Sequence, residues 1–343
     1  IKTPQILDKK LWQISVHWEK YKEHIFLSDY EKRSFAVKPM NCPGAMLVYK
    51  NNARSYKDLP LRLSELGIVH RQELSGVLSG LFRVIQFTQD DAHIFCSEKS
   101  LESEIFSIME MIDRFYKKFN FTYRVELSTR PEKRIGEEKL WDKAEELLEK
   151  AMKKKKMKFK INKGDGAFYG PKIDFHITDS LGRSWQLATI QLDFAMPERF
   201  DLHYTDSDNT EKQPIIIHRV IYGSLERFIG ILLEHTNGQL PLWLAPIQVR
   251  VINFTDRQTK ACEKLRDELL EKNVRVSMDL SSEPIGGKIK QAEIEKLPYI
   301  IVIGDKEEKA GTLAVRRRGK ITSVKTKKFV EDIMEEIAEK RFS

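Results

Sequence analysis

The stretch Arg83-Val84-Ile85-Gln86-Phe87-Thr88-Gln89-Asp90-Asp91-Ala92-His93-Ile94-Phe95 decides the fold. As a β-strand, with its period of two, it would place every odd-numbered residue from Arg83 to His93 on one face. That face would carry a cation, an aromatic ring, an amide, a carboxylate and an imidazole, which favours the floor of an active site. The alternative is the charged outer face of an antiparallel sheet. Both interpretations predict a sheet-rich domain around this strand.

A second segment, Leu66 to Gly76, comes just before this strand and is also rich in polar groups. We expect Arg71 and Glu73 to share a strand face, and the loop Ser75 to Gly80 to turn the chain back. Arg71 and Arg83 would then converge on one anion from adjacent strands. Arginine suits phosphate because its planar fork stays charged and offers several donors. Ordinary cross-strand ion pairs are the alternative.

A third segment, Gly223 to His235, predicts an amphipathic helix with Ser224 as its N-cap. The expected buried stripe consists of Leu225, Phe228, Ile229 and Leu232. Arg227 would lie in the first turn, where the helix dipole disfavours a cation. An anion bound at the same helix N-terminus would explain this arginine. A solvated arginine paired with a neighbouring glutamate is the alternative.

Composition places these segments in a globular chain long enough for two domains. The 343 residues are 41% hydrophobic and 32% charged, and no run approaches the length of a membrane span. The net charge of +8 permits a polyanionic partner. From Ile247 onward there are 21 basic and 17 acidic residues, which favours a C-terminal module that faces nucleic acid.

The expected boundary is a linker at 245–248, which gives domains 1–245 and 246–343. The first reads as an α+β unit with an antiparallel sheet and helices at Ser100 to Phe119 and Ser224 to His235. The second reads as a smaller α/β domain. Its expected strands and helices, in chain order, are 249–254, 258–272, 274–278, 289–295, 299–303, 312–316 and 328–340.

Three further features bear on context. Cys42, Cys96 and Cys262 are odd in number and widely spaced, so we expect free thiols and a reducing, cytoplasmic compartment. The N-terminus lacks a secretory signal and a starting Met, so we expect an upstream segment. The basic run Lys153 to Lys158 reads as a solvated helix end, with a polyanion contact as the alternative.

The whole chain resembles the threonyl-tRNA synthetase family, a class II aminoacyl-tRNA synthetase family. The resemblance is carried by the motifs Met40 to Gly44, His70 to Gly76, Phe87 to Phe95, Tyr169 to Phe175, Ile190 to Phe194 and Gly223 to Phe228. It implies a class II catalytic domain followed by an anticodon-binding domain, without the family's N-terminal editing region. The implied reaction is ATP-dependent activation of threonine, or of a related amino acid, and its transfer to tRNA(Thr).

The resemblance also implies a zinc site with Cys42, His93 and His218 as ligands. Three protein ligands leave a fourth position open, as a substrate-binding zinc requires. In the family that position takes the amino and hydroxyl groups of the amino acid, so valine is rejected for lack of a hydroxyl. The implied amino-acid contacts are Gln89, Asp91, Tyr169 and Gln191. By spacing alone these ligands form no compact metal motif.

For ATP, the resemblance assigns Arg71 to the α-phosphate, and Arg83 and Arg227 to the outer phosphates, as the catalytic residues. Glu73 would contact the adenine edge and Phe87 would stack on the base. Gln186 and Thr189 complete the implied ATP site, and Mg²⁺ would bridge the phosphates. The amino acid carboxylate attacks the α-phosphorus, a step that needs positioning and charge neutralisation more than a protein nucleophile.

Anticodon reading is implied for Lys290, Glu307 and Arg316, whose charged groups can pair with exposed bases. A basic surface hairpin is the alternative for Arg316 to Arg318. The family implies a homodimer with no membrane association. The alternative function is a catalytically silent, tRNA-binding or regulatory paralogue, against which the retained Arg71, Glu73 and zinc ligands argue.

Several positions depart from the family pattern. They are Val16, Ala45, Ile85, Leu187, Ala188, Val220 and Tyr222. Most flank the implied ligands, so we hypothesise a reshaped pocket that accepts another amino acid or resists an inhibitor. Strict alternation also puts Gln186 and Gln191 on opposite strand faces, so that either a bulge intervenes or one of them lies outside the site.

Overall fold

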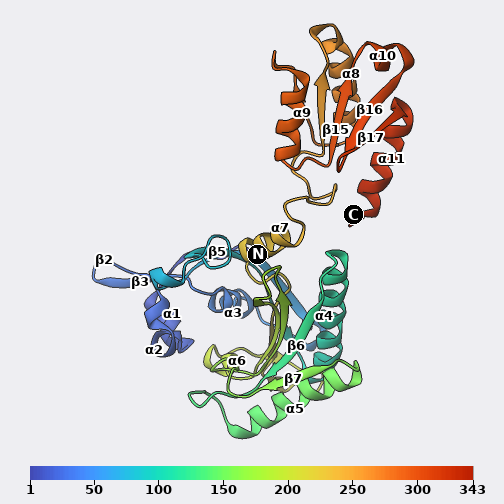
Figure 1. Ribbon diagram of the computed structural model, residues 1–343. Helices are drawn as coiled ribbons and strands as arrows, with labels where there is room; N and C mark the ends of the chain where they lie inside the picture. Colours follow the sequence, from blue (N-terminus) through green and yellow to red (C-terminus); the bar gives the residue numbers. More distant parts are fainter. Residues whose placement is uncertain (343) are drawn as a thin grey trace. The chain divides into compact units, whose positions relative to one another are not determined.

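The deciding stretch forms β5, Gln86–Cys96, in a large sheet of the computed structural model, which describes residues 1–342. The strand order is β4 (Leu61–His70), β5, β12 (Ile215–Val220), β9 (Ser184–Asp193), β8 (Lys172–Thr178), β6 (Tyr123–Ser128) and β7 (Phe159–Asn162). Its neighbours are antiparallel, except that β6 and β7 are parallel. The expected α+β architecture with an antiparallel sheet is therefore confirmed (Figure 1).

Helices cover one face of this sheet. α4 (Glu98–Lys118) contacts β5, β9 and β12, and α5 (Glu138–Lys154) packs beside α4 (Figure 1). Apolar residues at helical spacing, such as Ile105 and Ile112, are fully buried. The basic run after residue 152 ends α5, where Lys153 to Lys155 form ion pairs with acidic residues of α4 and α5. This placement agrees with a helix end.

The opposite side of the sheet carries shorter elements that surround the site. The helices there are α1 (Lys9–Ile14), α2 (His17–Lys20), α3 (Cys42–Lys50) and α6 (Met196–Arg199). Helix α7 (Leu225–His235) instead packs Phe228 against Phe119, which follows α4, with ring centroids 4.9 Å apart. A small sheet has the order β1 (Ile6–Asp8), β3 (Arg33–Val37) and β2 (Leu27–Tyr30), and β10 (Tyr204–Thr205) pairs with β11 (Glu211–Lys212). Single 3₁₀ turns lie at Lys22–His24, Tyr56–Asp58 and Ser75–Val77.

Helix α7 begins as expected but buries a different stripe. The Arg227 N–H donates to Ser224 Oγ at 3.2 Å, so Ser224 caps the helix. Phe228 and Leu232 are buried, but Ile229 is 47% exposed, and Ile231 is buried in its place. The expectation of a buried Ile229 was therefore wrong. At 100° per residue, Ile231 lies about 60° from Phe228 and Ile229 lies about 60° from Leu232, so spacing alone does not separate the two positions.

Both strands were expected to run further than they do. β4 ends at His70, so Arg71 and Glu73 follow it and share no strand face. β5 begins at Gln86, so Arg83 and Ile85 precede it, and Ile85 is 40% exposed. Ladder pairing stops because the connecting segment folds on itself, with the Ser79 N–H donating to Arg83 O at 3.0 Å. The Arg71 N–H still reaches Ile85 O at 2.8 Å.

The C-terminal unit is the expected smaller α/β domain. Its sheet has the order β14 (Val276–Asp279), β13 (Val249–Asn253), β15 (Tyr299–Ile303), β16 (Thr312–Arg317) and β17 (Lys320–Lys325). β13 is parallel to β14 and β15, and the last pairs are antiparallel. The helical elements are a 3₁₀ turn at Asp256–Gln258, α8 (Thr259–Glu271), α9 (Ile285–Ile294), α10 (Asp305–Ala310) and α11 (Thr326–Glu339). β17 and α10 were not expected from sequence.

The chain divides into compact units at Ile1–Leu232 and Leu233–Ser343, so the second unit begins before the expected linker. The reason is that the segment after α7 packs within the C-terminal unit. Leu242 joins its core, and Arg275 donates to Ala245 O at 2.8 Å and to Trp243 O at 3.0 Å. Within residues 1–342, no helix has the length and apolar character needed to cross a membrane.

Candidate active site

A cavity of about 490 Å³ opens over the large sheet in the Ile1–Leu232 unit. Residues from β5, β9, β12, α3 and the start of α7 line it together with the segments that flank β5. Those lining residues that the sequence singled out are Cys42, Arg71, Glu73, Arg83, Phe87, Gln89, Asp91, Tyr169, Gln186, Thr189, Gln191, His218 and Arg227. The fold thus brings all the expected ATP and amino-acid positions to one cavity.

One end of the cavity holds the expected metal ligands. A ligand atom of Cys42, of His93 and of His218 lies within 4.8 Å of each of the others, and all three residues are buried. His93 and His218 are direct partners in the β5–β12 ladder, while Cys42 begins α3. Spacing could not show this cluster, because strand pairing and a helix start bring the three together.

The donor set fits a zinc ion. Within residues 1–342, His93 Nε2 and His218 Nδ1 are buried and have no hydrogen-bond partner. Buried ring nitrogens without partners are costly unless they bind something. One thiolate and two imidazoles are a donor combination that zinc accepts, and three ligands leave a position open.

Asp193, to which no role was given from sequence, orients His218. Its Oδ2 accepts a hydrogen bond from His218 Nε2 at 2.9 Å, while Oδ1 accepts from the Ala195 and Met196 N–H groups, each at 2.9 Å. Asp193 is fully buried. A carboxylate that holds the outer nitrogen of a histidine is the usual support of a metal ligand. Its place in the quoted motif Ile190 to Phe194 was the available signal.

Electrostatics in this cluster favour the metal-binding form of the cysteine. Burial favours the neutral thiol of Cys42, but the His218 and His93 imidazoles outweigh it and lower the pKa of the thiol to about 7. Burial also opposes a charged His218, yet Cys42 and Asp193 raise the pKa of its imidazole to about 10. Thiolate beside imidazolium is thus the favoured pair, and a bound metal would displace the imidazolium proton.

Polar groups beside the cluster form the expected amino-acid end. Asn41 Nδ2 donates to Asp91 Oδ2 at 3.1 Å, and Tyr169 Oη donates to Gln191 Oε1 at 3.2 Å. The Tyr169 and His218 rings lie 5.3 Å apart. A Cβ on Gly67 would lie 2.2 Å from Asn41 Oδ1, so a glycine is needed here for Asn41 to reach Asp91. Asn41 was given no role from sequence, although its place in the quoted motif Met40 to Gly44 was an available signal.

The three expected arginines also line this cavity. The Arg71 guanidinium lies 5.0 Å from the Phe87 ring centroid, and its Nε donates to Pro39 O at 3.2 Å. Burial lowers the pKa of Arg227, and the positive charges of Arg83 and Arg71 lower it further. Arg227 makes no ion pair among residues 1–342, unlike the solvated Arg–Glu pair considered from sequence. Such a cluster of cations is typical of an anion site.

Arg83 is already paired. It forms an ion pair with Glu73 at 3.0 Å, although this arginine is half-exposed. The alternative of ordinary ion pairing therefore applies to Arg83 and Glu73, but not as a cross-strand pair, because both residues lie outside the strands. Glu73 lines the cavity, and its carboxylate is bound there by the Arg83 guanidinium.

A β-bulge in β9 settles the facing of the two glutamines. Gln186 pairs with His176 and Thr189 with Asp174, so two residues of β9, Leu187 and Ala188, oppose one residue of β8. Gln186 and Gln191 therefore both line the cavity. The bulge alternative considered from sequence is confirmed.

The positions that depart from the family pattern are not equivalent. Leu187 and Val220 line the cavity, whereas Ala45, Ala188 and Val16 are buried behind it, and Tyr222 packs on Phe228 with ring centroids 4.6 Å apart. Val16 has φ 62°, a left-handed conformation that β-branched residues rarely adopt. Ile85 lies outside the cavity lining, which contradicts its expected position beside Arg83 and Asp91.

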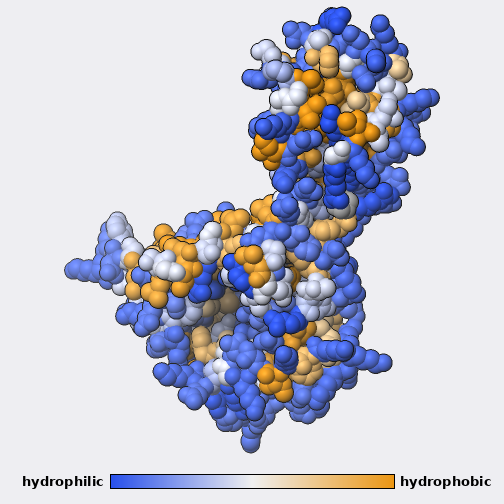
Figure 2. Space-filling view, viewed as in Figure 1, coloured by the Kyte–Doolittle hydropathy of each residue, from blue (hydrophilic) through white to orange (hydrophobic). Residues whose placement is uncertain are grey.

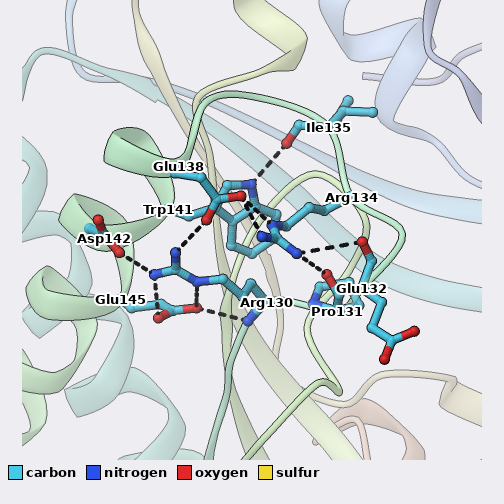
Figure 3. A network of polar contacts seen from close by, with 9 residues as sticks. All are labelled: Arg130, Pro131, Glu132, Arg134, Ile135, Glu138, Trp141, Asp142 and Glu145. Atoms are coloured by element: carbon cyan, nitrogen blue, oxygen red, sulfur yellow. Dashed lines mark hydrogen bonds and ion pairs between the residues drawn. The ribbon is translucent and has the colours of Figure 1, made fainter.

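A surface network braces the wall that carries Tyr169 (Figure 3). Arg130 pairs with Glu138, Asp142 and Glu145 of α5, and Trp141 Nε1 donates to Ile135 O at 2.8 Å. The Ile135 N–H in turn donates to Phe168 O at 2.8 Å. The wall of the cavity is therefore tied to α5 through the loop 129–137.

The three expected anticodon positions lie in the C-terminal unit. Arg316, on β16, lines a cavity of about 320 Å³ together with Lys296 and Leu297. Glu307 Oε2 accepts from the Gly304 N–H at 3.1 Å at the start of α10, and Lys290 is exposed on α9. Arg316 to Arg318 form the end of the β16–β17 hairpin, as the basic-hairpin alternative expected.

Comparisons with known proteins agree with this arrangement. Residues 21–236 match the family described as "tRNA synthetase class II core domain (G, H, P, S and T)", and residues 248–340 match "Anticodon binding domain". The fold and the site thus define a class II aminoacyl-tRNA synthetase core with an anticodon-binding module.

Individual relatives narrow the class. The chain is 51% identical to a threonine–tRNA ligase of Caldanaerobacter subterraneus and 54% identical to one of Acetivibrio thermocellus, in each case over 99% of this chain. It spans about half of those relatives, 53% and 54% of their lengths. The crystal structure of the RNA-binding domain of threonyl-tRNA synthetase from Cryptosporidium parvum superposes with a TM-score of 0.94 at 38% identity, over 98% of this chain and 85% of that one. The chain belongs to the threonyl-tRNA synthetase family.

Proposed function

We propose that this chain activates threonine with ATP to threonyl adenylate and transfers the threonyl group to tRNA(Thr). The observation that carries the proposal is that one cavity is lined both by Cys42 and His218 of the Cys42–His93–His218 cluster and by Arg71, Arg83 and Arg227. A metal-binding end suits an amino acid with a hydroxyl group, and an arginine end suits a triphosphate.

In the proposed reaction the chain supplies position and charge. Arg71 would neutralise the α-phosphate, and Arg83 and Arg227 the outer phosphates, and Mg²⁺ bound with ATP would supply further positive charge. The threonine carboxylate then attacks the α-phosphorus and pyrophosphate leaves. Phe87, Gln186 and Thr189 would hold the adenosine part, and the Glu73 carboxylate would have to be shared between the adenine edge and Arg83. Positioned reactants need no protein nucleophile.

Zinc is the metal we propose for the Cys42–His93–His218 cluster. Bound there, zinc would act as a Lewis acid that takes the amino and hydroxyl groups of threonine. Asp91, with Asn41 behind it, and the Tyr169–Gln191 pair would orient the rest of the amino acid. The valine side chain offers no hydroxyl, so valine would leave a coordination position unfilled. Metal analysis of Cys42→Ser tests this assignment, because an unchanged zinc content would remove Cys42 from the ligand set.

The proposal extends to partners and location. Lys290, Glu307 and Arg316 would read the anticodon, and domains 1–245 and 246–343 would be the catalytic and anticodon-binding modules. We also propose a homodimer, supported by hydrophobic side chains gathered over the small β1–β3–β2 sheet (Figure 2), where Ile6 is 63% and Tyr30 67% exposed. A cytoplasmic location fits the three free cysteines, Cys42, Cys96 and Cys262.

Amino-acid-dependent exchange between ATP and pyrophosphate tests the function directly. Each standard amino acid is offered in turn to zinc-loaded protein, and the highest exchange rate is expected with threonine. Exchange with a different amino acid would show an altered specificity, for which Leu187 and Val220 are candidates because they line the cavity. No exchange with any amino acid, at full zinc occupancy, would instead favour a catalytically silent paralogue.

A further inference from the structure

The turn Ile221–Ser224, which joins β12 to α7, is held by a buried carboxylate. Asp90 accepts hydrogen bonds from the N–H groups of Ile221 at 2.8 Å, Tyr222 at 3.0 Å and Gly223 at 3.1 Å. Asp90 is 9% exposed, and Arg219 Nη1 lies 3.6 Å from its Oδ2. Asp90 precedes Asp91 on β5, and its side chain points to the opposite face of the strand.

A second carboxylate makes the reciprocal contact. Glu226, in the first turn of α7, accepts the Thr88 N–H with Oε1 at 3.0 Å and Oε2 at 2.9 Å. Ser224 Oγ donates to the same carboxylate at 2.9 Å. Gln89 and Ser224 also form a backbone bridge. β5 therefore supplies a carboxylate that binds three amides of the turn before α7, and α7 supplies a carboxylate that binds one amide of β5.

A backbone carbonyl of the turn is bound by another buried side chain. Tyr116 Oη on α4 donates to Ile221 O at 2.9 Å and accepts the Ala188 N–H at 2.9 Å. The same hydroxyl thus joins this turn to the bulge in β9. With its amides and this carbonyl bound by buried side chains, the turn has little freedom to move.

The residue that this arrangement places is Arg227, which directly follows Glu226. Arg227 Nε donates to Phe82 O at 2.8 Å, and the guanidinium lies 5.3 Å from the Trp185 ring centroid. Its neighbours Arg71 and Arg83 also line the cavity, and like charges repel. The side chain of Arg227 contacts only neutral acceptors and a ring, which do not offset the repulsion from Arg71 and Arg83. The position of its guanidinium therefore depends on how firmly the backbone of Arg227 is held.

We propose that Asp90 and Glu226 are positioning residues that fix Arg227 relative to the amino-acid end of the cavity. β5 carries Gln89, Asp91 and His93, and α7 carries Arg227, so the two carboxylates set the spacing between the amino-acid and triphosphate ends. The inference rests on the proposed function for the identity of the ligands. The hydrogen bonds that join β5 to the turn and to α7 do not depend on the identity of the ligands.

The test compares Asp90→Asn and Glu226→Gln with wild-type protein. The control is Glu104→Gln, because Glu104 is also buried and charge-paired, with Arg62, but lies on α4 away from the cavity. Equilibrium ATP binding and the exchange assay are measured with zinc content and thermal unfolding. We expect at least roughly tenfold weaker ATP binding and a higher KM for ATP in the Asp90 and Glu226 variants, with the amino acid KM within about twofold of wild type. Glu104→Gln should lower the unfolding temperature alone.

A double-mutant comparison separates positioning from general stability. If Asp90 acts through Arg227, Asp90→Asn should weaken ATP binding by less than about twofold when added to Arg227→Ala. An equally large effect in both backgrounds would overturn the proposal, as would ATP binding near the wild-type value in the single variants. A wild-type protein that binds ATP without any exchange would refute the proposed function and leave this comparison valid. If Asp90→Asn does not fold, Glu226→Gln carries the same test.

Discussion

Asp193 Oδ2 accepts a hydrogen bond from His218 Nε2 at 2.9 Å, and both side chains are buried beneath the cavity. This contact assigns the proton of His218 to Nε2, so Nδ1 is the nitrogen that faces Cys42 and His93. The orientation of the His218 imidazole, which we propose binds the metal, is thus set by a residue that does not itself belong to the cluster. The ring can turn its metal-binding nitrogen away only by losing this bond.

Replacing Asp193 should therefore weaken metal binding without removing a ligand. Asp193→Asn is expected to lower zinc affinity about 10- to 100-fold, because the support of His218 is weakened. Competition with a chelator of known affinity measures this. Asp179→Asn is the matched control, since Asp179 is a buried carboxylate that accepts N–H bonds in the β8–β9 turn. Equal zinc affinity for wild type and Asp193→Asn would refute the assignment.

Removing zinc should expose a selectively reactive thiol. The pKa of Cys42 is lowered to about 7, whereas burial raises the pKa of Cys96 to about 12 and that of Cys262 to about 11. At pH 8 we expect an alkylating reagent to label Cys42 first after chelation, because it is largely thiolate and lines the cavity. Peptide mass spectrometry identifies the site. Rapid labelling that persists in Cys42→Ser would contradict this order.

Acid should destabilise the protein through His17. Burial is the main cause that lowers the pKa of His17 to about 3, with the charges of His218 and Arg71 acting in the same direction. His17 is therefore protonated below about pH 6.5 in the unfolded chain but stays neutral in the folded chain. The free energy of unfolding falls as the pH drops below about 6.5. From pH 7 to 5, chelated wild type should lose about 2 kcal/mol more than His17→Asn. Urea unfolding at both pH values measures the difference. Parallel losses in the two proteins would show that His17 does not titrate as expected.

Anticodon reading should be separable from amino acid activation. Arg316→Ala is expected to raise the KM for tRNA by about 5- to 150-fold, the loss of roughly 1–3 kcal/mol that one base contact supplies. ATP–pyrophosphate exchange should be unchanged, because Arg316 lies in the C-terminal unit and that assay needs no tRNA. Lys320→Ala, on the same hairpin, is the control for loss of positive charge. Equal effects of both substitutions would indicate a general charge effect.

The strands and most helices could be predicted because their residues repeat with a clear period. β15 begins and ends at the expected Tyr299 and Ile303, and α7 has its expected cap. Other features are decided by tertiary contacts that have no local period. The end of β4 before Arg71 depends on the fold of the connecting loop, and the burial of Ile231 in place of Ile229 depends on what packs against α7.

The same distinction holds for the site. Asp91 was found because polar groups are interleaved with apolar ones on its expected strand face. Arg71 was found because it was expected to converge with Arg83 on an anion, and Arg227 because the helix dipole disfavours a cation in the first turn. Asn41, Asp90 and Asp193 were given no role from sequence. Each acts on another side chain or on backbone amides, and such a supporting role produces no recognisable pattern of hydropathy. The ion pair between Arg83 and Glu73 was considered only as an alternative between strands, since the sequence could not show where the strands stop.

The β-bulge in β9 makes the cavity sensitive to a one-residue deletion in this strand. On its N-terminal side Gln186 faces the cavity, and on its C-terminal side Thr189 and Gln191 do, although even and odd positions should point opposite ways. One strand thereby carries both Gln186 and Thr189, which we propose bind the nucleotide, and Gln191, which we propose binds the amino acid. Deleting a single residue at Leu187 or Ala188 would restore simple alternation and turn one half of the strand inside out. Point substitutions here alter the shape of the cavity, but a one-residue deletion would reverse which side chains belong to it.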